Sequence, residues 1–390
     1  MKAVIMAGGK GTRIASMVGD VPKPMIRICG KPILQWEIEC LARNKITDIT
    51  IVIGHLGHFI REYFADGAAF GVKIDYYEET EPLGTAGALY RIPGLDEDIL
   101  LLNGDTIFDI DFSRFIAFHR SRGTSQGATS CGAAQGGAHC EATGPVLASL
   151  MTHPNSHPYD SALIETEILP PQEEGGMPCD SHRVVRWLNK EDDRLWYHNR
   201  VNAGIQIVSP ALLAQAAALL PPETRGGKLD LDRDILKPAV ASGGIYAYDS
   251  SEYVKDMGTP DRFHQVEADI RGGLVGARNL GCPQKAFFLD RDGTITRSSG
   301  FLTDINDMEL LPGAAEAVRR INESGYLAIV VTNQPQIARG ELDFAGLSQI
   351  HDKMETLLGR EGASLDAIYF CPHHPDSGFP GERPAYKKAC

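Results

Sequence analysis

The chain has 390 residues, which is long enough for two or three compact units with hydrophobic cores. Its formal charge of -13 argues against nonspecific electrostatic binding to nucleic acid or to an anionic membrane. Any anionic ligand must therefore be bound by a local cluster of positive or hydrogen-bond-donating groups. The first residues lack a charged leader, no apolar run reaches the length of a membrane span, and the 8 cysteines are typical of reduced thiols or metal ligands. We therefore expect a cytoplasmic protein.

The first 268 residues follow an order of strands and helices that is typical of a parallel α/β sheet. Short apolar runs at 3–6, 49–54 and 99–105 predict buried strands, and the apolar positions of 32–42 recur at helical spacing. Ligands of such sheets gather beyond the carboxyl ends of the strands. The stretch 124–148, rich in Gly, Ala, Ser and Thr, predicts an insertion.

A second unit with the same alternation of strands and helices follows a stretch without apolar periodicity. Apolar runs at 286–290, 327–333 and 367–370 predict strands, and amphipathic patterns at 313–324 and 345–358 predict helices. We therefore predict three segments: a domain over 1–268, a linker over 269–285 and a second α/β domain over 286–390.

A glycine loop, AGGKGTR, follows the first strand at 7–13. Its glycines let backbone amides approach phosphate oxygens closely: Gly8, Gly9 and Gly11. A tight structural turn would also explain such a cluster, and neither the Walker pattern nor the dinucleotide fingerprint is present. However, two prolines hold Lys23 in a restricted backbone at 22–24, and Arg13 offers a guanidinium to the same phosphates. The combination predicts a phosphate site.

This order of motifs resembles the sugar-phosphate nucleotidyltransferase family, whose signature is GGxGTR followed by PKP, over residues 1 to about 265. The resemblance implies an N-terminal Rossmann-like domain with a mixed, mostly parallel sheet flanked by helices. It also implies that a nucleotidyl group is transferred to a sugar 1-phosphate, and we expect this group to be GMP from GTP. By resemblance the site residues are catalytic Arg13 and Lys23; nucleotide-binding Gly8, Gly9, Gly11, Thr12, Gly84 and Thr85; sugar-phosphate-binding Lys190, Asn202 and Gly204; and Mg²⁺ ligands Asp105 and Asp256.

The chemistry fits these residue types. Both reactants are anions, so the enzyme must neutralise charge and fix geometry rather than supply a nucleophile. Mg²⁺ on the two aspartates would screen the α-phosphate, Arg13 and Lys23 would stabilise the departing pyrophosphate, and Lys190 would anchor the sugar phosphate. The family usually has Glu-Lys-Pro where this chain has Asn-Lys-Glu at 189–191.

One stretch bears on the sugar. HPNSHPYDS at 153–161 resembles a segment of guanylyltransferases that act on D-glycero-α-D-manno-heptose 1-phosphate. A rigid loop containing proline is the alternative interpretation, and a hexose such as mannose is the alternative acceptor. The base cannot be read from the residues.

Two carboxylates, Asp290 and Asp292, stand two positions apart just past the apolar run at 286–290. At that spacing one can attack phosphorus while the other protonates the leaving group, with Mg²⁺ reducing their repulsion. VVTNQ ends the next strand at Thr332 and Asn333. The set resembles the haloacid-dehalogenase-like phosphohydrolases, with a second Rossmann-like domain, Asp290 as nucleophile, Asp292 as general acid/base, both as Mg²⁺ ligands, and Thr332 and Asn333 at the phosphate.

The segments LPGAAEAV, VVTNQPQIARG and CPHHP together resemble the heptose 1,7-bisphosphate 7-phosphatase and histidinol-phosphatase group, in which CPH and a later CxC bind a structural Zn²⁺. This chain has PQIARG where that group usually has SGIARG. The resemblance implies the ligands Cys371, His373 and Cys390, and a tetrahedral site needs a fourth, for which His374 is an alternative to a residue beyond Cys390. We expect the phosphatase domain to be truncated and either weakly active or inactive in this chain, and natural degeneracy is the alternative.

The two resemblances agree on one reaction sequence, in which a phosphatase leaves the 1-phosphate that the transferase activates. The rivals are a mannose 1-phosphate nucleotidyltransferase fused to a histidinol-phosphatase-type domain and a non-catalytic regulator that binds nucleotide sugars. The expected partners are a nucleoside triphosphate and a sugar 1-phosphate, with neither nucleic acid nor membrane. Relatives often associate, which leaves a homo-oligomer open.

Overall fold

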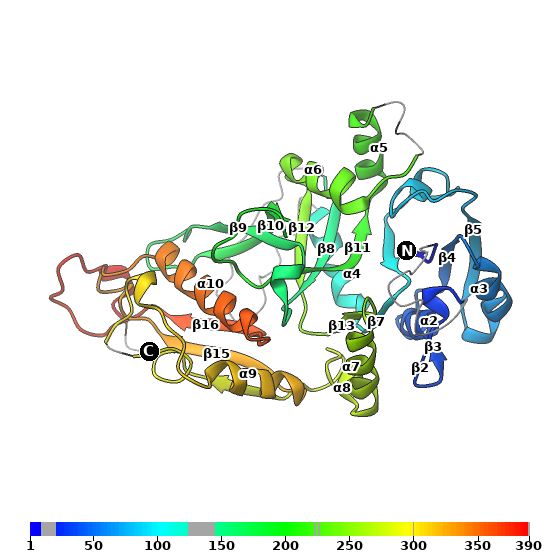
Figure 1. Cartoon of the computed structure of the whole chain (residues 1–390). Helices are drawn as coiled ribbons and strands as arrows, with labels where there is room; N and C mark the ends of the chain where they lie inside the picture. Colours follow the sequence, from blue (N-terminus) through cyan, green and yellow to red (C-terminus); the bar gives the residue numbers. More distant parts are fainter. Residues whose placement is uncertain (9–20, 124–144, 222–223, 225–226, 299, 389–390) are drawn as a thin grey trace.

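The computed structural model describes residues 1–8, 21–123, 145–221, 224, 227–298 and 300–388. Within these ranges the chain folds into two α/β units that lie side by side (Figure 1). Five predicted site residues lie outside the described residues: Gly9, Gly11, Thr12, Arg13 and Cys390. Most of the predicted insertion, residues 124–144, lies outside them as well.

The N-terminal unit is built on a sheet in the order β5-β4-β1-β6-β11-β8-β12-β10-β9. In chain order its strands are β1 (Lys2–Met6), β4 (Asp48–Ile53), β5 (Lys73–Glu78), β6 (Ile99–Asn103), β8 (Ala148–His153), β9 (Leu163–Leu169), β10 (Cys179–Leu188), β11 (Val201–Val208) and β12 (Ile245–Asp249). All of them except β10 and β11 run in the same direction. The predicted mixed, mostly parallel sheet is therefore confirmed.

Both faces of this sheet are buried, which explains the continuous apolar runs of its central strands. Val4 and Leu101 pack into one core cluster, whereas their neighbours Ala3, Ile5 and Leu100 pack into the other. Successive side chains of a strand point to opposite faces, so a strand buried on both sides needs apolar residues at every position.

Helices and two short sheets surround the central sheet. The helices are α2 (Ile33–Arg43), α3 (Gly57–Phe64), α4 (Phe112–Gly123), α5 (Pro210–Leu219) and α6 (Lys237–Ala239). The short sheets pair β2 (Arg27–Ile28) with β3 (Lys31–Pro32), and β7 (Thr106–Asp109) with β13 (Tyr253–Asp256). Among the described parts of the chain, no helix is both long enough and apolar enough to cross a membrane.

The predicted linker, 269–285, is partly helical and well packed. Helix α7 (Pro260–Arg271) extends into it, and α8 (Leu274–Ala277) follows. Arg278, only 9% exposed, then donates to the Asp366 carboxylate at 2.7 Å and to the Tyr326 carbonyl at 3.2 Å. The segment that leaves the first unit is thus fixed to the second.

The C-terminal unit contains a parallel sheet in the order β14-β15-β16, formed by β14 (Ala286–Leu289), β15 (Leu327–Asn333) and β16 (Ala367–Cys371). Helices α9 (Ala314–Glu323) and α10 (Phe344–Arg360) lie close to the predicted positions and share a core with Ala328 and Val330. On the other face Phe288 is 70% exposed and Val331 is 48% exposed. Both helices therefore cover one face of this sheet.

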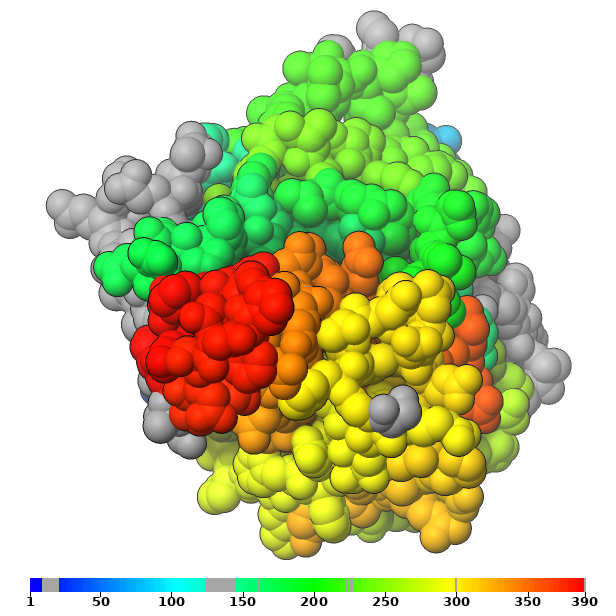
Figure 2. All heavy atoms as spheres, turned by 90° about the vertical axis from the view of Figure 1, so that its left-hand side faces the viewer, coloured from blue at the N-terminus to red at the C-terminus, as the bar shows by residue number. Residues whose placement is uncertain are grey.

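The two units meet through α10. The buried Glu355 carboxylate lies 2.6 Å from His198 Nδ1 and accepts from the Asn199 N–H at 3.0 Å. One position along, the Thr356 hydroxyl accepts from the Tyr197 N–H at 3.0 Å. Figure 2 shows the C-terminal residues, yellow to red, packed against the green part of the N-terminal unit.

Candidate active site

Lys23 and Asp105 form an ion pair at the carboxyl edge of the large sheet. Lys23 begins a short 3-10 turn whose Pro24 is buried, and its ammonium donates to the Asp105 carboxylate. Asp105 stands in the turn between β6 and β7 and keeps 35% of its side chain exposed. The predicted cation and the predicted metal ligand are therefore in direct contact.

Asp256, far away in sequence, is brought to the same edge by the pairing of β13 with β7. The Cα partner of Asp256 is Thr106, and the Met257 N–H donates to the Asp105 carbonyl at 3.0 Å. The Asp256 carboxylate, 52% exposed, lies 2.5 and 2.7 Å from Arg262 Nη1. Carboxylate oxygens are preferred ligands of Mg²⁺, so the donor atoms of both aspartates fit this ion.

Glu37 is a buried carboxyl beneath this site that sequence reasoning missed. It lies on α2, is 0% exposed, and its Oε1 accepts from the Thr106 N–H at 3.1 Å. Burial raises the pKa of Glu37 well above its ordinary value and Asp105 adds to the rise, while the Thr106 N–H and Lys23 act against it. The raised pKa favours the neutral form of Glu37, which supports the backbone that follows Asp105 through the Thr106 N–H.

Gly8 is the one glycine of the predicted phosphate loop that lies within the described residues. A Cβ there would come 2.7 Å from a Glu79 carboxylate oxygen, and a Cβ on Gly54 would come 3.0 Å from the Gly8 carbonyl. Two strand ends, those of β1 and β4, thus approach each other at this point. An added Cβ at Gly8 would therefore require the Glu79 side chain to shift.

Gly84 and Thr85, predicted at the nucleotide, are fixed to a distant segment. Gly84 has a φ of +76°, and a Cβ there would lie 2.3 Å from the Leu229 carbonyl oxygen. The Thr85 hydroxyl accepts from the Leu231 N–H at 2.7 Å, which commits this oxygen to the backbone. Glycine is thus required at position 84 because the backbones of residues 84 and 229 approach each other closely.

Asn202 and Gly204 lie at an irregularity in β11, where the pairing with β8 changes register. Asn202 Oδ1 accepts from the Gly204 N–H at 3.2 Å, and its Nδ2 lies 3.4 Å from the Asp232 carboxylate. Burial and the neighbouring Asp230 raise the pKa of Asp232 to about 6, against the effect of Asn202. Asp232 is a second residue that sequence reasoning missed, although it stands in the acidic run LDLDRD.

Lys190 does not contact the two aspartates but lines a pocket between the two units. Its side chain is 66% exposed, and Glu191 lies 3.9 Å from its ammonium. The pocket, about 410 Å³ in volume, is also lined by Tyr159, Arg194, Tyr197 and Arg360.

The predicted phosphatase residues gather at the carboxyl edge of the smaller sheet. Asp290 follows β14, and Thr332 and Asn333 end β15. The Asp290 Oδ1 accepts from the Arg291 N–H at 2.8 Å. Asp292 accepts from Arg291, Gln334 and Thr296 at 2.9, 3.0 and 3.1 Å. Burial alone would raise the pKa of Asp292, but these hydrogen bonds and the charge of Arg291 hold it below its ordinary value.

Arg291 and Gln334 are the two members of this network that sequence reasoning missed. Arg291 is 0% exposed, and its Nη2 donates to Gln334 Oε1 at 2.8 Å. Gln334 in turn donates to the Thr332 hydroxyl at 2.9 Å. Gln334 therefore joins Asp292 to Thr332, and Arg291 donates to both Asp292 and Gln334. Both residues stand beside the predicted motifs, in DRDG and TNQ.

Two of the three predicted zinc ligands are neighbours. Cys371 ends β16, and its Sγ lies 3.5 Å from His373 Nδ1. His374, the alternative ligand, accepts from the Asp376 N–H at 3.1 Å through its Nδ1. The thiol and imidazole suit Zn²⁺, and the third predicted ligand, Cys390, lies beyond the described ranges.

Residues 2–139 match the family model described as "Nucleotidyl transferase". The N-terminal unit therefore contains a nucleotidyltransferase domain. Mannose-1-phosphate guanylyltransferase catalytic subunit beta of Danio rerio is 28% identical over 268 residues, which are 67% of this chain and 62% of that protein. D-glycero-alpha-D-manno-heptose 1-phosphate guanylyltransferase of Campylobacter jejuni is 42% identical over 115 residues, 29% of this chain and 52% of that protein. The chain thus spans less than two thirds of the length of either relative.

The crystal structure of HddC from Yersinia pseudotuberculosis is similar to this chain with a TM-score of 0.50 at 22% identity. The match covers 69% of this chain and 99% of that one. This likeness shows a shared α/β fold.

Proposed function

We propose that the chain transfers GMP from GTP to a sugar 1-phosphate and releases pyrophosphate. The observation that carries the proposal is the β7–β13 pairing, which brings Asp256 beside Thr106 while Lys23 contacts Asp105. Two carboxylates and one cation thus lie at the edge of the sheet where β1 and β6 end, in a chain whose residues 2–139 match the nucleotidyltransferase model. The activities named for the relatives from Danio rerio and Campylobacter jejuni support the guanylyl donor.

The acceptor that we propose is D-glycero-α-D-manno-heptose 1-phosphate. The Campylobacter jejuni relative, which is named for this sugar, has the higher identity, 42% over 115 residues. Mannose 1-phosphate is the second candidate, because the Danio rerio relative named for it matches over the longer stretch, 268 residues.

In the proposed reaction an oxygen of the sugar 1-phosphate attacks the α-phosphorus in line, and pyrophosphate leaves. No side chain is needed as a nucleophile, so the chain binds and orients two anions. Asp105 and Asp256 would hold Mg²⁺, which when bound supplies positive charge to the triphosphate oxygens. Lys23 would donate to a phosphate oxygen from its place beside Asp105, and Asn202 would donate to a sugar hydroxyl.

Pyrophosphate release, measured over a panel of nucleoside triphosphates and sugar 1-phosphates, tests the proposal. We expect GTP with the heptose acceptor to give the highest kcat/KM. Asp105→Asn and Asp256→Asn should each lower it by about 100-fold or more, whereas Asp261→Asn, an exposed acid beside the site, should stay within about twofold. If no nucleotide in the panel gives pyrophosphate release and the protein still binds a nucleotide sugar, a regulator is favoured instead.

We also propose that the C-terminal unit belongs to a phosphatase of the heptose 1,7-bisphosphate type. Asp290 would be the nucleophile and Asp292 the general acid/base, both would be ligands of Mg²⁺, and Cys371 and His373 would bind Zn²⁺ with Cys390. Phosphate release from a sugar bisphosphate, compared between wild type, Asp290→Asn and the exposed control Asp307→Asn, tests this assignment. If the wild type releases phosphate, release that is unchanged in Asp290→Asn would reject Asp290 as the nucleophile.

A further inference from the structure

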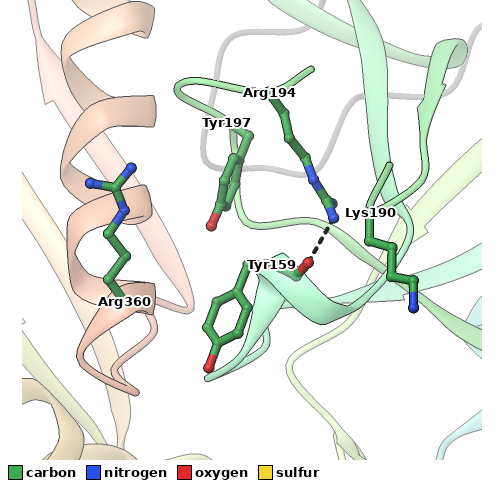
Figure 3. A pocket seen from close by; sticks show the side chains of 5 residues that line it. All are labelled: Tyr159, Lys190, Arg194, Tyr197 and Arg360. Carbon is green, nitrogen blue, oxygen red and sulfur yellow. Dashed lines mark hydrogen bonds between the residues drawn. The ribbon is translucent and has the colours of Figure 1, made fainter. Parts of the chain in front are cut away.

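The pocket at the junction of the two units is lined by cations from both of them. Lys190 and Arg194 belong to the N-terminal unit, and Arg360 stands in the last turn of α10. Figure 3 shows Arg360 extending from its helix on one side and Lys190 and Arg194 on the other, with the rings of Tyr159 and Tyr197 between them. The lining thus combines three positive charges with two phenol hydroxyls and contains no carboxylate.

These positive charges are only weakly compensated. Among the described residues, no carboxylate forms an ion pair with Arg360, whose guanidinium lies 5.4 Å from the centre of the Trp196 ring. Lys190 has Glu191 at 3.9 Å as its nearest acid. Arg194 is fixed by two carbonyls, Tyr159 at 2.7 Å and Ser161 at 2.8 Å, which orient its guanidinium without neutralising it. A pocket of this charge favours an anion.

Arg360 is held at the pocket by the packing of α10. Thr356, one turn earlier, is bonded to the Tyr197 backbone, so the helix is fixed to a segment that lines the pocket. Gly359 faces Pro158, and a Cβ at this position would come 2.9 Å from the proline ring. The glycine therefore permits the close approach that places the next residue, Arg360, beside Tyr159.

The pocket is also linked through the backbone to Asn202, which is predicted to bind the sugar phosphate. The Asn202 N–H donates to the Ala162 carbonyl at 3.2 Å, and the adjoining Ser161 carbonyl is the one that Arg194 holds. A volume of about 410 Å³ lies within the range of small-molecule sites. Guanidinium groups bind phosphates through paired hydrogen bonds, and tyrosines offer both a flat apolar face and a hydroxyl to a sugar.

We propose that this junction pocket holds the phosphate of the sugar 1-phosphate acceptor and that Arg360, supplied by the C-terminal unit, determines the affinity of the nucleotidyltransferase for that acceptor. The inference rests on the proposed transfer reaction and adds to it a residue from outside the N-terminal unit. The C-terminal unit then completes the acceptor site of its neighbour, whatever reaction it performs itself.

Steady-state kinetics of Arg360→Ala and Lys353→Ala test this inference. Lys353 is a matched control because it stands on the same helix, lies 5.3 Å from the centre of the same Trp196 ring and is not part of the pocket. In Arg360→Ala we expect the KM for the sugar 1-phosphate to rise about 10-fold or more, with the KM for GTP unchanged within about twofold. Arg360→Lys should recover part of the loss, and Lys353→Ala should resemble wild type.

A rise in acceptor KM that is equal in Arg360→Ala and Lys353→Ala, or no rise in either, would overturn the inference. If the wild type releases no pyrophosphate with any nucleotide, the transfer proposal fails and the pocket is tested by calorimetric titration with the sugar 1-phosphate alone. Binding by wild type and Lys353→Ala but not by Arg360→Ala would keep the pocket as an anion site. Equal binding by all three proteins, or none by the wild type, would reject it.

Discussion

Replacing Glu37 by Gln should leave the protein at least as stable as the wild type at neutral pH, whereas replacing it by Ala should cost about 3 kcal/mol. Gln keeps the volume and the oxygen that accepts from the Thr106 N–H. Ala leaves that N–H without its acceptor in a buried site, which costs about 1–3 kcal/mol. It also removes a methylene and leaves a cavity, for about 1 kcal/mol more.

The pH dependence distinguishes a protonated Glu37 from a charged one. Its pKa is raised in the folded state, so the stabilisation is fully present below the ordinary value of 4.5 and is lost as pH rises through the folded-state pKa. Gln has no titrating proton, so the stability of Glu37→Gln relative to the wild type should increase as the pH rises above 4.5. Urea unfolding of the three proteins at several pH values measures this difference. If Gln costs as much as Ala, or the gap between Gln and wild type stays constant with pH, Glu37 is charged in the fold and the reasoning is wrong.

Two further changes test the loop contacts and the junction. Gly84→Ala should raise the KM for the nucleotide and lower the free energy of unfolding by about 2 kcal/mol or more, because the added Cβ would clash with the Leu229 carbonyl. Gly94→Ala is the control, because Gly94 has φ +72° with open space around it and the substitution introduces only backbone strain. Equal losses of stability in the two variants would contradict the clash. Burial acts to lower the pKa of His198, but Glu355 outweighs it and raises the pKa to about 9, so the contribution of this pair to stability is complete below 6.5 and lost as pH rises through about 9. The His198 side chain is 47% exposed, so solvent screening reduces the contribution of the ion pair to stability to about 1 kcal/mol. His198→Gln should therefore lower Tm near pH 6 and leave it unchanged near pH 10. A lower Tm that persists at pH 10 would exclude the ion pair as its cause.

The features that could be predicted from the sequence depend on local pattern. The apolar run of β6 ends in a turn that carries Asp105, so periodicity alone places this carboxylate at a strand end. Its association with Asp256 had to be inferred by resemblance, because the pairing of β7 with β13 joins positions that are distant along the chain. The start of β14 at Ala286 was likewise signalled by an apolar run after a lapse of periodicity.

The residues that were missed are polar groups whose environment is created by tertiary packing. Glu37 occupies one position of an amphipathic helix and looks like a surface acid until Thr106 and the turn at Asp105 cover it. Arg291 stands between two predicted aspartates, where a solvated arginine is the ordinary expectation, yet it is fully buried. Arg360 ends a helix in a different unit from the pocket that it lines, so no local pattern could connect them.

Helix α10 limits how far the chain can be dissected into parts. On one side it carries Leu347, Ile350 and Met354 into the core of the second unit, while Glu355 is buried against the backbone of the first. A fragment that stops before residue 286 would expose the main-chain amides of this contact to water and lose a wall of the pocket. The two units therefore cannot be exchanged independently between proteins, because each of them needs its contacts with α10.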